Sequence, residues 1–192
     1  MKLYLLLLGA EAPGRVVEQH DYFFGIAENL AALIPEVKAS WPDAGASLHL
    51  DGWREVTKVE HYAVKVIPHE QHSNTNINQN QNANLNLFFL NLGGYTTGKL
   101  EEQHYTLLTI QENRIQAVKA AKDHLFFQTN SLKGIATAHI DEKYGVDVDS
   151  VHHIAELLPP EIKAQYCITF EDGTHLPEDK IHLGYFKLDK LK

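Results

Sequence analysis

The chain has 192 residues, of which 44% are hydrophobic and 22% charged, and its net charge is −8. These proportions are typical of a globular protein with a core, while the acidic balance, without any Lys/Arg cluster, lacks the basic footprint that nucleic-acid binding needs. The single cysteine, Cys167, excludes an intrachain disulfide and a paired-cysteine zinc site. A chain with a single cysteine and no disulfide fits a reducing, cytoplasmic setting.

The first predicted elements are two strands followed by a helix. The apolar run Leu3–Leu8 ends at Gly9 and predicts a buried strand. It also imitates a short signal peptide, but the pattern recurs inside the chain at Leu87–Gly94, where it cannot direct secretion, and it is too short to span a bilayer. We therefore expect no membrane association. Further elements are predicted at residues 18–25 (strand), 27–40 (helix, which Pro35 should kink or delay) and 56–67 (strand).

An Asn/Gln-rich tract at residues 69–85 separates the two halves of the chain. It contains too little apolar surface to offset the entropy of ordering it, so it predicts a flexible linker. The elements expected after it are strands at 87–94 and 102–109, a helix at 111–125, a second helix near 149–158, and strands at 166–171 and 181–188.

Residues 2–41 and 86–125 are predicted to be two copies of one unit. A shift of 84 positions, which puts Leu3 on Leu87, gives 12 identities over residues 3–41, against about three expected by chance. We expect an α+β protein made of two tandem β-β-α-β units, each with a mixed sheet and one main helix, packed about a pseudo-twofold axis. The predicted boundaries are 1–68 for the first unit, 69–85 for the linker, and 86–192 for the second unit with its C-terminal strands.

Two short polar motifs recur in both halves, Glu-x-His and His-x-Asp. Residues two apart in a strand point to the same face, so each pair is expected to converge. Imidazoles together with carboxylates suit Zn²⁺, Mn²⁺ or Fe²⁺. The candidates are Glu18, His20, His49 and Asp51, which we predict as the metal ligands, and Glu102, His104, His139 and Asp141.

The same motifs have two other interpretations. A His-x-Asp at the junction of a strand and a turn often fixes a loop through hydrogen bonds to the backbone, and a Glu-x-His can cover a sheet edge. A structural polar network is therefore one alternative, and binding of a ligand without chemistry is another. Since the sequence contains neither a nucleophile elbow nor a complete phosphate loop, we assign no catalytic residues.

The order of these motifs resembles a small bacterial family known as domain-of-unknown-function family 1543, whose members carry one or two copies of the unit. The matching features of the first copy are Leu8-Gly9, Glu18-Gln19-His20-Asp21, Pro35-Glu36-Val37-Lys38 with Trp41, and His49-Leu50-Asp51. In the second copy Tyr105, Lys119 and Leu125 depart from the pattern. The resemblance covers about two thirds of the chain and implies no activity.

We accordingly expect an uncharacterised bacterial protein that serves as a binding or interaction module, with a groove for a small-molecule ligand between the two units. The alternative is a divalent-metal-dependent enzyme that uses the Glu-x-His and His-x-Asp pairs. Homodimerisation through sheet edges is a further open alternative.

Overall fold

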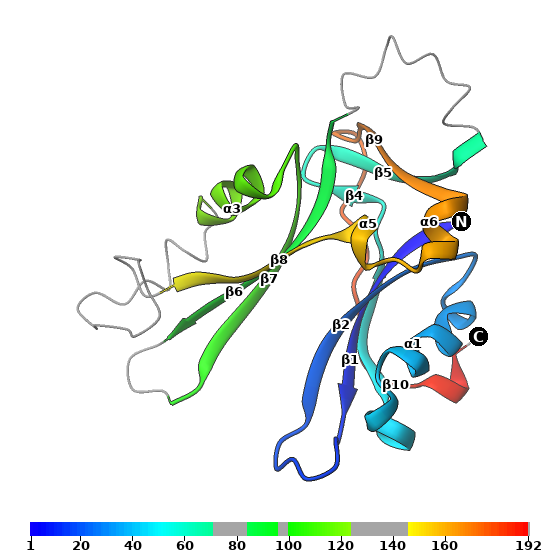
Figure 1. Cartoon of the computed structure of the whole chain (residues 1–192), viewed down its shortest axis with the longest axis vertical. Coiled ribbons are helices and arrows are strands. Elements are labelled where there is room, and N and C mark those ends of the chain that lie inside the picture. The colour runs from blue at the N-terminus through cyan, green and yellow to red at the C-terminus, as the bar shows by residue number, and fades with distance from the viewer. Residues whose placement is uncertain (71–83, 96–99, 124–145, 192) are drawn as a thin grey trace. The chain divides into compact units, whose positions relative to one another are not determined.

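The computed structural model describes residues 1–70, 84–95, 100–123 and 146–191. The chain forms two compact units: the first comprises Met1–Gln79 and Leu158–Lys192, and the second Asn80–Leu157. Both contain antiparallel sheets and short helices (Figure 1), so the predicted α+β class is confirmed. Among the described residues, no helix has the length and apolar character needed to cross a membrane.

The larger sheet of the first unit has four antiparallel strands in the order β10-β3-β1-β2. The strands are β1 (Lys2–Ala10), β2 (Gln19–Ala27), β3 (His49–Glu55) and β10 (His182–Lys187). The predicted strand at residues 3–8 is therefore the inner strand β1, which explains its continuous apolar run. Residues 49–51, which the sequence did not assign to an element, open strand β3.

Alternate residues of β1 build the core on one face of this sheet. Tyr4, Leu6, Leu8 and Ala10 are buried against a 3-10 turn (Leu30–Leu33) and helix α1 (Ile34–Ser40). Asn29 caps the turn, since its side chain accepts a hydrogen bond from the Ala32 amide at 3.1 Å. Pro35 lies in the first turn of α1, where its missing N–H costs nothing, so of the two effects predicted for Pro35 the structure shows the delayed helix start and not the kink. A second 3-10 segment, Pro42–Ser47, leads into β3.

The smaller sheet of the first unit has the order β4-β5-β9. Its strands are β4 (Lys58–Val59), β5 (Tyr62–Pro68) and β9 (Tyr166–Asp172), with helix α6 (Pro160–Gln165) before β9 and a 3-10 turn (Leu188–Lys190) after β10. The single strand predicted at 56–67 is thus two strands joined by a turn.

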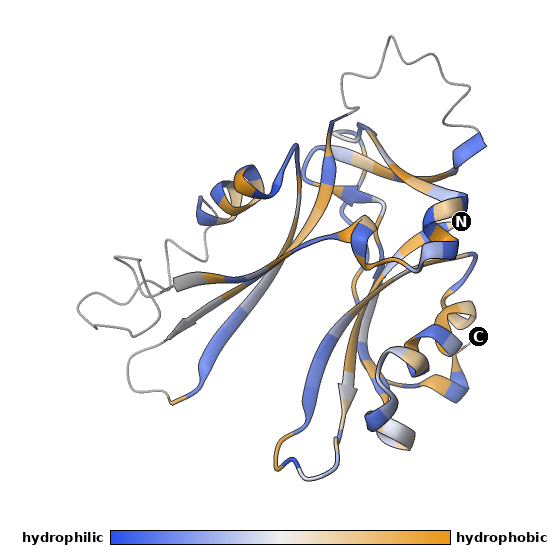
Figure 2. Cartoon of the chain, viewed as in Figure 1, coloured by the Kyte–Doolittle hydropathy of each residue, from blue (hydrophilic) through white to orange (hydrophobic). Residues whose placement is uncertain are grey.

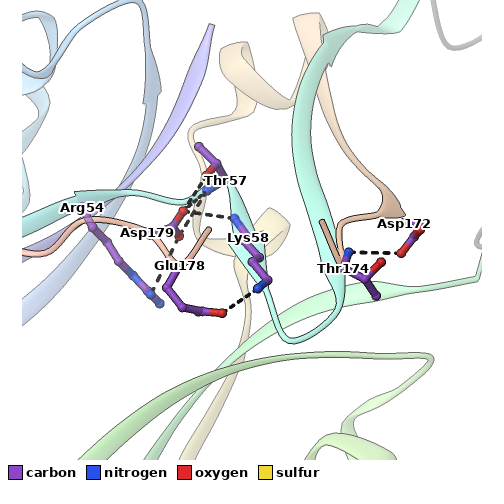
Figure 3. Close-up of polar contacts among 7 residues, drawn as sticks. All are labelled: Arg54, Thr57, Lys58, Asp172, Thr174, Glu178 and Asp179. Carbon is purple, nitrogen blue, oxygen red and sulfur yellow. Dashed lines mark hydrogen bonds and ion pairs between the residues drawn. The ribbon is translucent and has the colours of Figure 1, made fainter. Parts of the chain in front are cut away.

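The C-terminal segment is tied to the first unit by the Asp179 carboxylate, which is only 1% exposed (Figure 3). It accepts hydrogen bonds from the Thr57 amide (3.1 Å), the Thr57 hydroxyl (2.5 Å) and the Lys58 amide (3.2 Å). Arg54 lies 3.9 Å away and supplies a positive charge. These contacts hold the segment between β9 and β10 against the connection from β3 to β4.

The second unit has one described sheet, of order β7-β6-β8. Its elements are β6 (Asn86–Tyr95), β7 (Glu102–Gln111), α3 (Arg114–Lys122), β8 (Val146–His153) and α5 (Ile154–Leu157). Phe88, Leu90 and Leu92 of β6 pack against Ala117 and Ala121 of α3. Among its described residues, the apolar stripe predicted for this helix (Ile115, Val118, Ala121 and Leu125) shares only Ala121 with that buried face, since Ile115 is 82% exposed. Leu125 lies outside the described residues.

Two expectations about the C-terminal third differ from the structure. The helix predicted at residues 149–158 is strand β8 as far as His153, and only 154–157 are helical; the reason is that β8 pairs with β6 and half-buries Val148 and Val151 there. Residues 158–192 were expected in the second unit, but β9 pairs with β5 and β10 with β3. Hydrophobic periodicity identifies a strand without specifying its partner.

Candidate metal centre

The polar cluster of the first unit lies on the face of the four-stranded sheet that α1 does not cover. Gly9 on β1 is the register partner of both His20 on β2 and His49 on β3, and cross-strand partners share a face. The first residues of β2, like those of β7, are hydrophilic (Figure 2). Glu18, two residues before His20, reaches the same face. The histidines therefore flank a glycine on the inner strand.

A β-bulge brings the last member of the cluster into place. The register between β1 and β3 passes from Leu7↔Gly52 to Leu8↔Leu50, which leaves Asp51 as the extra residue. Bulges bend a strand and re-aim a side chain. Here the result is that Asp51 and His49 of one strand point toward the same place.

Gly9 provides the room for this arrangement. A Cβ atom at this position would lie 2.6 Å from the Asp51 Oδ2 atom and 2.6 Å from the His49 Nε2 atom. Any other residue would therefore push both groups away. The Asp51 and His49 side chains approach the backbone of β1 closely, which explains why this strand position is a glycine.

The four predicted ligands converge. His20 Nε2 lies 3.0 Å from Asp51 Oδ2 and 3.8 Å from Glu18 Oε2. His49 Nε2 lies 3.2 Å from Glu18 Oε1 and 3.2 Å from Asp51 Oδ1. Each carboxylate thus presents one oxygen to each imidazole. The His20 and Glu18 side chains are 47% and 40% exposed, and Asp51 is 26% exposed.

His49 differs from the other three because its side chain is only 4% exposed. Its Nδ1 atom lies 2.8 Å from the Ser47 carbonyl oxygen; a carbonyl can only accept, so Nδ1 carries a proton and donates. Its Nε2 atom is buried and makes no hydrogen bond with proper geometry to any described residue. A buried polar atom without a partner is costly and calls for an explanation.

A similar but smaller cluster lies in the second unit. Gly93 on β6 is the register partner of His104, as Gly9 is of His20, and the bulge at Asn91/Leu92 leaves Asp149 as the extra residue. His104 Nε2 lies 3.6 Å from Glu102 Oε2 and 3.4 Å from Asp149 Oδ2. The register position that His49 holds in the first unit belongs here to Asp147.

The sequence missed Asp149. His139 and Asp141, predicted as its place in the second copy, lie outside the described residues. The signal that could have found Asp149 is Asp147-Val148-Asp149, an apolar residue between two acidic ones, which has the spacing of His49-Leu50-Asp51. Aligning the two halves of the chain by residue identity favours His139-x-Asp141, because it repeats His49-x-Asp51 although it lies at a different distance from the helix.

Two further features of the first unit are an open cavity and the cysteine. An open cavity of about 550 Å³ is lined by the His20 region, Arg15 and Trp41 among others, but Gln19 and Asp21, also in its lining, alternate with His20 and belong mainly to the opposite face of the sheet. Cys167 is half-buried, and burial raises the pKa of its thiol. This shift favours the unreactive protonated form.

A known protein family matches the part of the chain that contains the first cluster. Residues 15–66 match the model of the family described as Domain of Unknown Function (DUF1543). The resemblance stated from the sequence is confirmed over those residues, and the DUF1543 match spans Glu18, His20, His49 and Asp51. No curated protein matches the chain.

Among solved structures, the chain is similar to the one titled "Crystal structure of a protein Il1583 from Idiomarina loihiensis". The match covers 98% of each chain with a TM-score of 0.56 and 18% sequence identity. At this identity the likeness concerns the fold alone.

Proposed function

We propose that the first unit binds one divalent transition-metal ion through Glu18, His20, His49 and Asp51. The observation that carries the proposal is the His49 side chain. It is buried, its tautomer is fixed by the Ser47 carbonyl, and its unpartnered Nε2 atom lies 3.2 Å from an oxygen of each carboxylate.

The electrostatics of His49 favour a cation at this place. In its neutral form, with the proton on Nδ1, the ring would present a lone pair at Nε2, and that lone pair would face two carboxylate oxygens. A metal ion between them turns this repulsion into three attractive contacts. The hydrogen bond from Nδ1–H to a backbone carbonyl is also the usual way in which proteins orient a metal-bound imidazole.

Donor atoms of Glu18, His20 and Asp51 all lie within 4.8 Å of one another, and His49 joins this group through its contacts with the two carboxylates. With metal–ligand bonds of about 2.1 Å, a nitrogen and an oxygen lie about 2.9 Å apart at a right angle and about 3.4 Å apart at a tetrahedral angle. The two His49 contacts, at 3.2 Å, and the His20–Asp51 contact, at 3.0 Å, fall in this range. The His20–Glu18 contact, at 3.8 Å, joins two exposed side chains that can rotate.

Two imidazoles and two carboxylates suit zinc, manganese or iron. We propose a metal-binding module as the function. A metal-dependent enzyme is the second candidate, favoured by the exposure of three of the four ligands, because catalytic sites leave a coordination position accessible. The ligand groove expected between the two units stays a prediction.

The test is metal binding by the full chain, prepared without a histidine tag and stripped with chelator. Titration with Zn²⁺, Mn²⁺ and Fe²⁺, followed by elemental analysis, should give one tightly bound ion. His49→Gln and Asp51→Asn should lower its affinity by 10-fold to 100-fold or more, roughly the cost of disturbing a metal's surroundings. His182→Gln is the matched control, because His182 stacks on Trp53 on the other face of the same sheet.

The competing interpretation is a charged network in which His49 is an imidazolium paired with two carboxylates. In that case the stripped protein binds no stoichiometric ion, and His49→Gln lowers the free energy of unfolding while metal leaves the unfolding temperature unchanged. This outcome would refute the proposal.

A further inference from the structure

Exposed apolar side chains adjoin the polar cluster on the same face of the sheet. Two residues along β1 from Gly9, Leu7 pairs with Tyr22 on β2 and with Gly52 on β3, and Gly52 pairs with Leu183 on β10. Tyr22 is 37% exposed and Leu183 is 75% exposed. This row therefore runs across the sheet beside the row that holds His20, Gly9 and His49.

Strand β10 brings two of these side chains to the cluster. The Tyr185 ring lies over the His49 ring with centroids 4.1 Å apart, and it is still 64% exposed. Leu183 lies over Gly52, its Cδ2 atom 3.0 Å from the place that a Cβ would take. The apolar patch formed by Leu7, Tyr22, Leu183 and Tyr185 is thus continuous with the proposed metal ligands.

The grouping of these apolar side chains beside the polar cluster indicates a surface that binds another molecule. Single exposed apolar residues are ordinary on protein surfaces, whereas several together at the edge of a polar cluster indicate a binding surface. An ion held by His49 from below and by three partly exposed ligands would be accessible from solvent on the side where the patch lies. A molecule bound there would meet the ion and the aromatic rings at once.

We propose that the site binds a small molecule with a flat, apolar body and one anionic, oxygen-donating group. This inference rests on the proposed metal binding. The oxygen group would coordinate the ion, and the body would lie on Tyr185 and Leu183. Since two carboxylates already neutralise a divalent ion and the chain carries a net charge of −8, a monoanion is favoured over a multiply charged phosphate.

The experiment uses the zinc-loaded full chain and two probes with the same chelating group, acetohydroxamate and benzohydroxamate. Their affinities, measured by calorimetry, differ only through the ring. Covering about 60 Å² of apolar surface corresponds to about a tenfold gain in affinity, so benzohydroxamate should bind about tenfold more tightly. Leu183→Ser should remove most of that gain and leave zinc binding unchanged, whereas Ile115→Ser, at an 82% exposed position in the second unit, should not.

Each other result has a distinct meaning. Equal affinities for the two probes on a zinc-loaded protein, or a gain that survives Leu183→Ser, would overturn this inference while leaving the metal proposal intact. Failure to bind any of Zn²⁺, Mn²⁺ and Fe²⁺ would overturn both. A dimer that Leu183→Ser dissociates, seen by sedimentation, would show that a second copy of the chain covers the patch and would also overturn the inference.

Discussion

Substituting Gly9 by alanine tests the metal proposal without removing any ligand. The new Cβ would lie 2.6 Å from Asp51 Oδ2, 2.6 Å from His49 Nε2 and 3.0 Å from His49 Cε1. Ordinary contacts of this kind begin near about 3.4 Å, so Asp51 and His49 must each move by about 0.8 Å. Metal sites tolerate displacements of about 0.2 Å.

The Gly9→Ala variant is therefore expected to lose roughly 100-fold in metal affinity, at the upper end of what disturbed supporting groups cost. The metal-free protein should be destabilised by about 1–3 kcal/mol, because buried His49 has little room to move. Competition with a chromophoric chelator measures the affinity, and urea unfolding of the stripped protein measures the stability.

Gly93→Ala is the matched control. Its Cβ would meet Glu102 Oε1 at 2.5 Å and Asp149 Oδ1 at 2.6 Å, so it places the same strain in the other unit and should leave the tight site of the first unit unchanged. Wild-type metal affinity in Gly9→Ala would refute the reasoning, since it would mean that the ion is not held by the atoms above Gly9.

Two further predictions concern the rest of the first unit. Asp179→Ala should lower the free energy of unfolding by about 2–4 kcal/mol, because it leaves three donors without their acceptor. Glu178→Ala, which removes an 82% exposed partner of Lys58, should change the free energy of unfolding by less than about 1 kcal/mol. Equal effects of the two substitutions in urea unfolding would contradict this prediction. The raised pKa of Cys167 means less thiolate at pH 8, so iodoacetamide should modify the folded protein more slowly than the unfolded one, and equal rates by mass spectrometry would contradict it.

Local patterns in the sequence were sufficient for most elements. The apolar run at Leu3–Leu8 predicted β1, in which Tyr4, Leu6 and Leu8 are buried in the core while Leu5 and Leu7, on the other face of this inner strand, are half-buried. The apolar stripes predicted α1, which begins at Ile34 after a 3-10 turn in keeping with a delay by Pro35, and α3, whose buried face differs from the predicted stripe. The Glu-x-His pairs were found because period-two spacing places both side chains on one face of a strand.

Pairing was beyond the sequence, because a strand's pattern records only how buried each of its faces is. Strands β9 and β10 were recognised but assigned to the wrong unit, since their partners β5 and β3 lie about a hundred residues away in the chain. The bulges that aim Asp51 and Asp149 are properties of two strands in register, and neither strand alone encodes them.

The Glu18, His20, His49 and Asp51 set was predicted from residue type and spacing, which the sequence gives directly, and its role in metal binding stays a proposal. What only the tertiary structure decided is which of these atoms have partners. The Ser47 carbonyl fixes the His49 tautomer, Tyr185 covers its ring, and Gly9 leaves the space above β1. The cost of an unpartnered buried nitrogen depends on the loss of surrounding water, and that loss arises only when strands from both ends of the chain pack together.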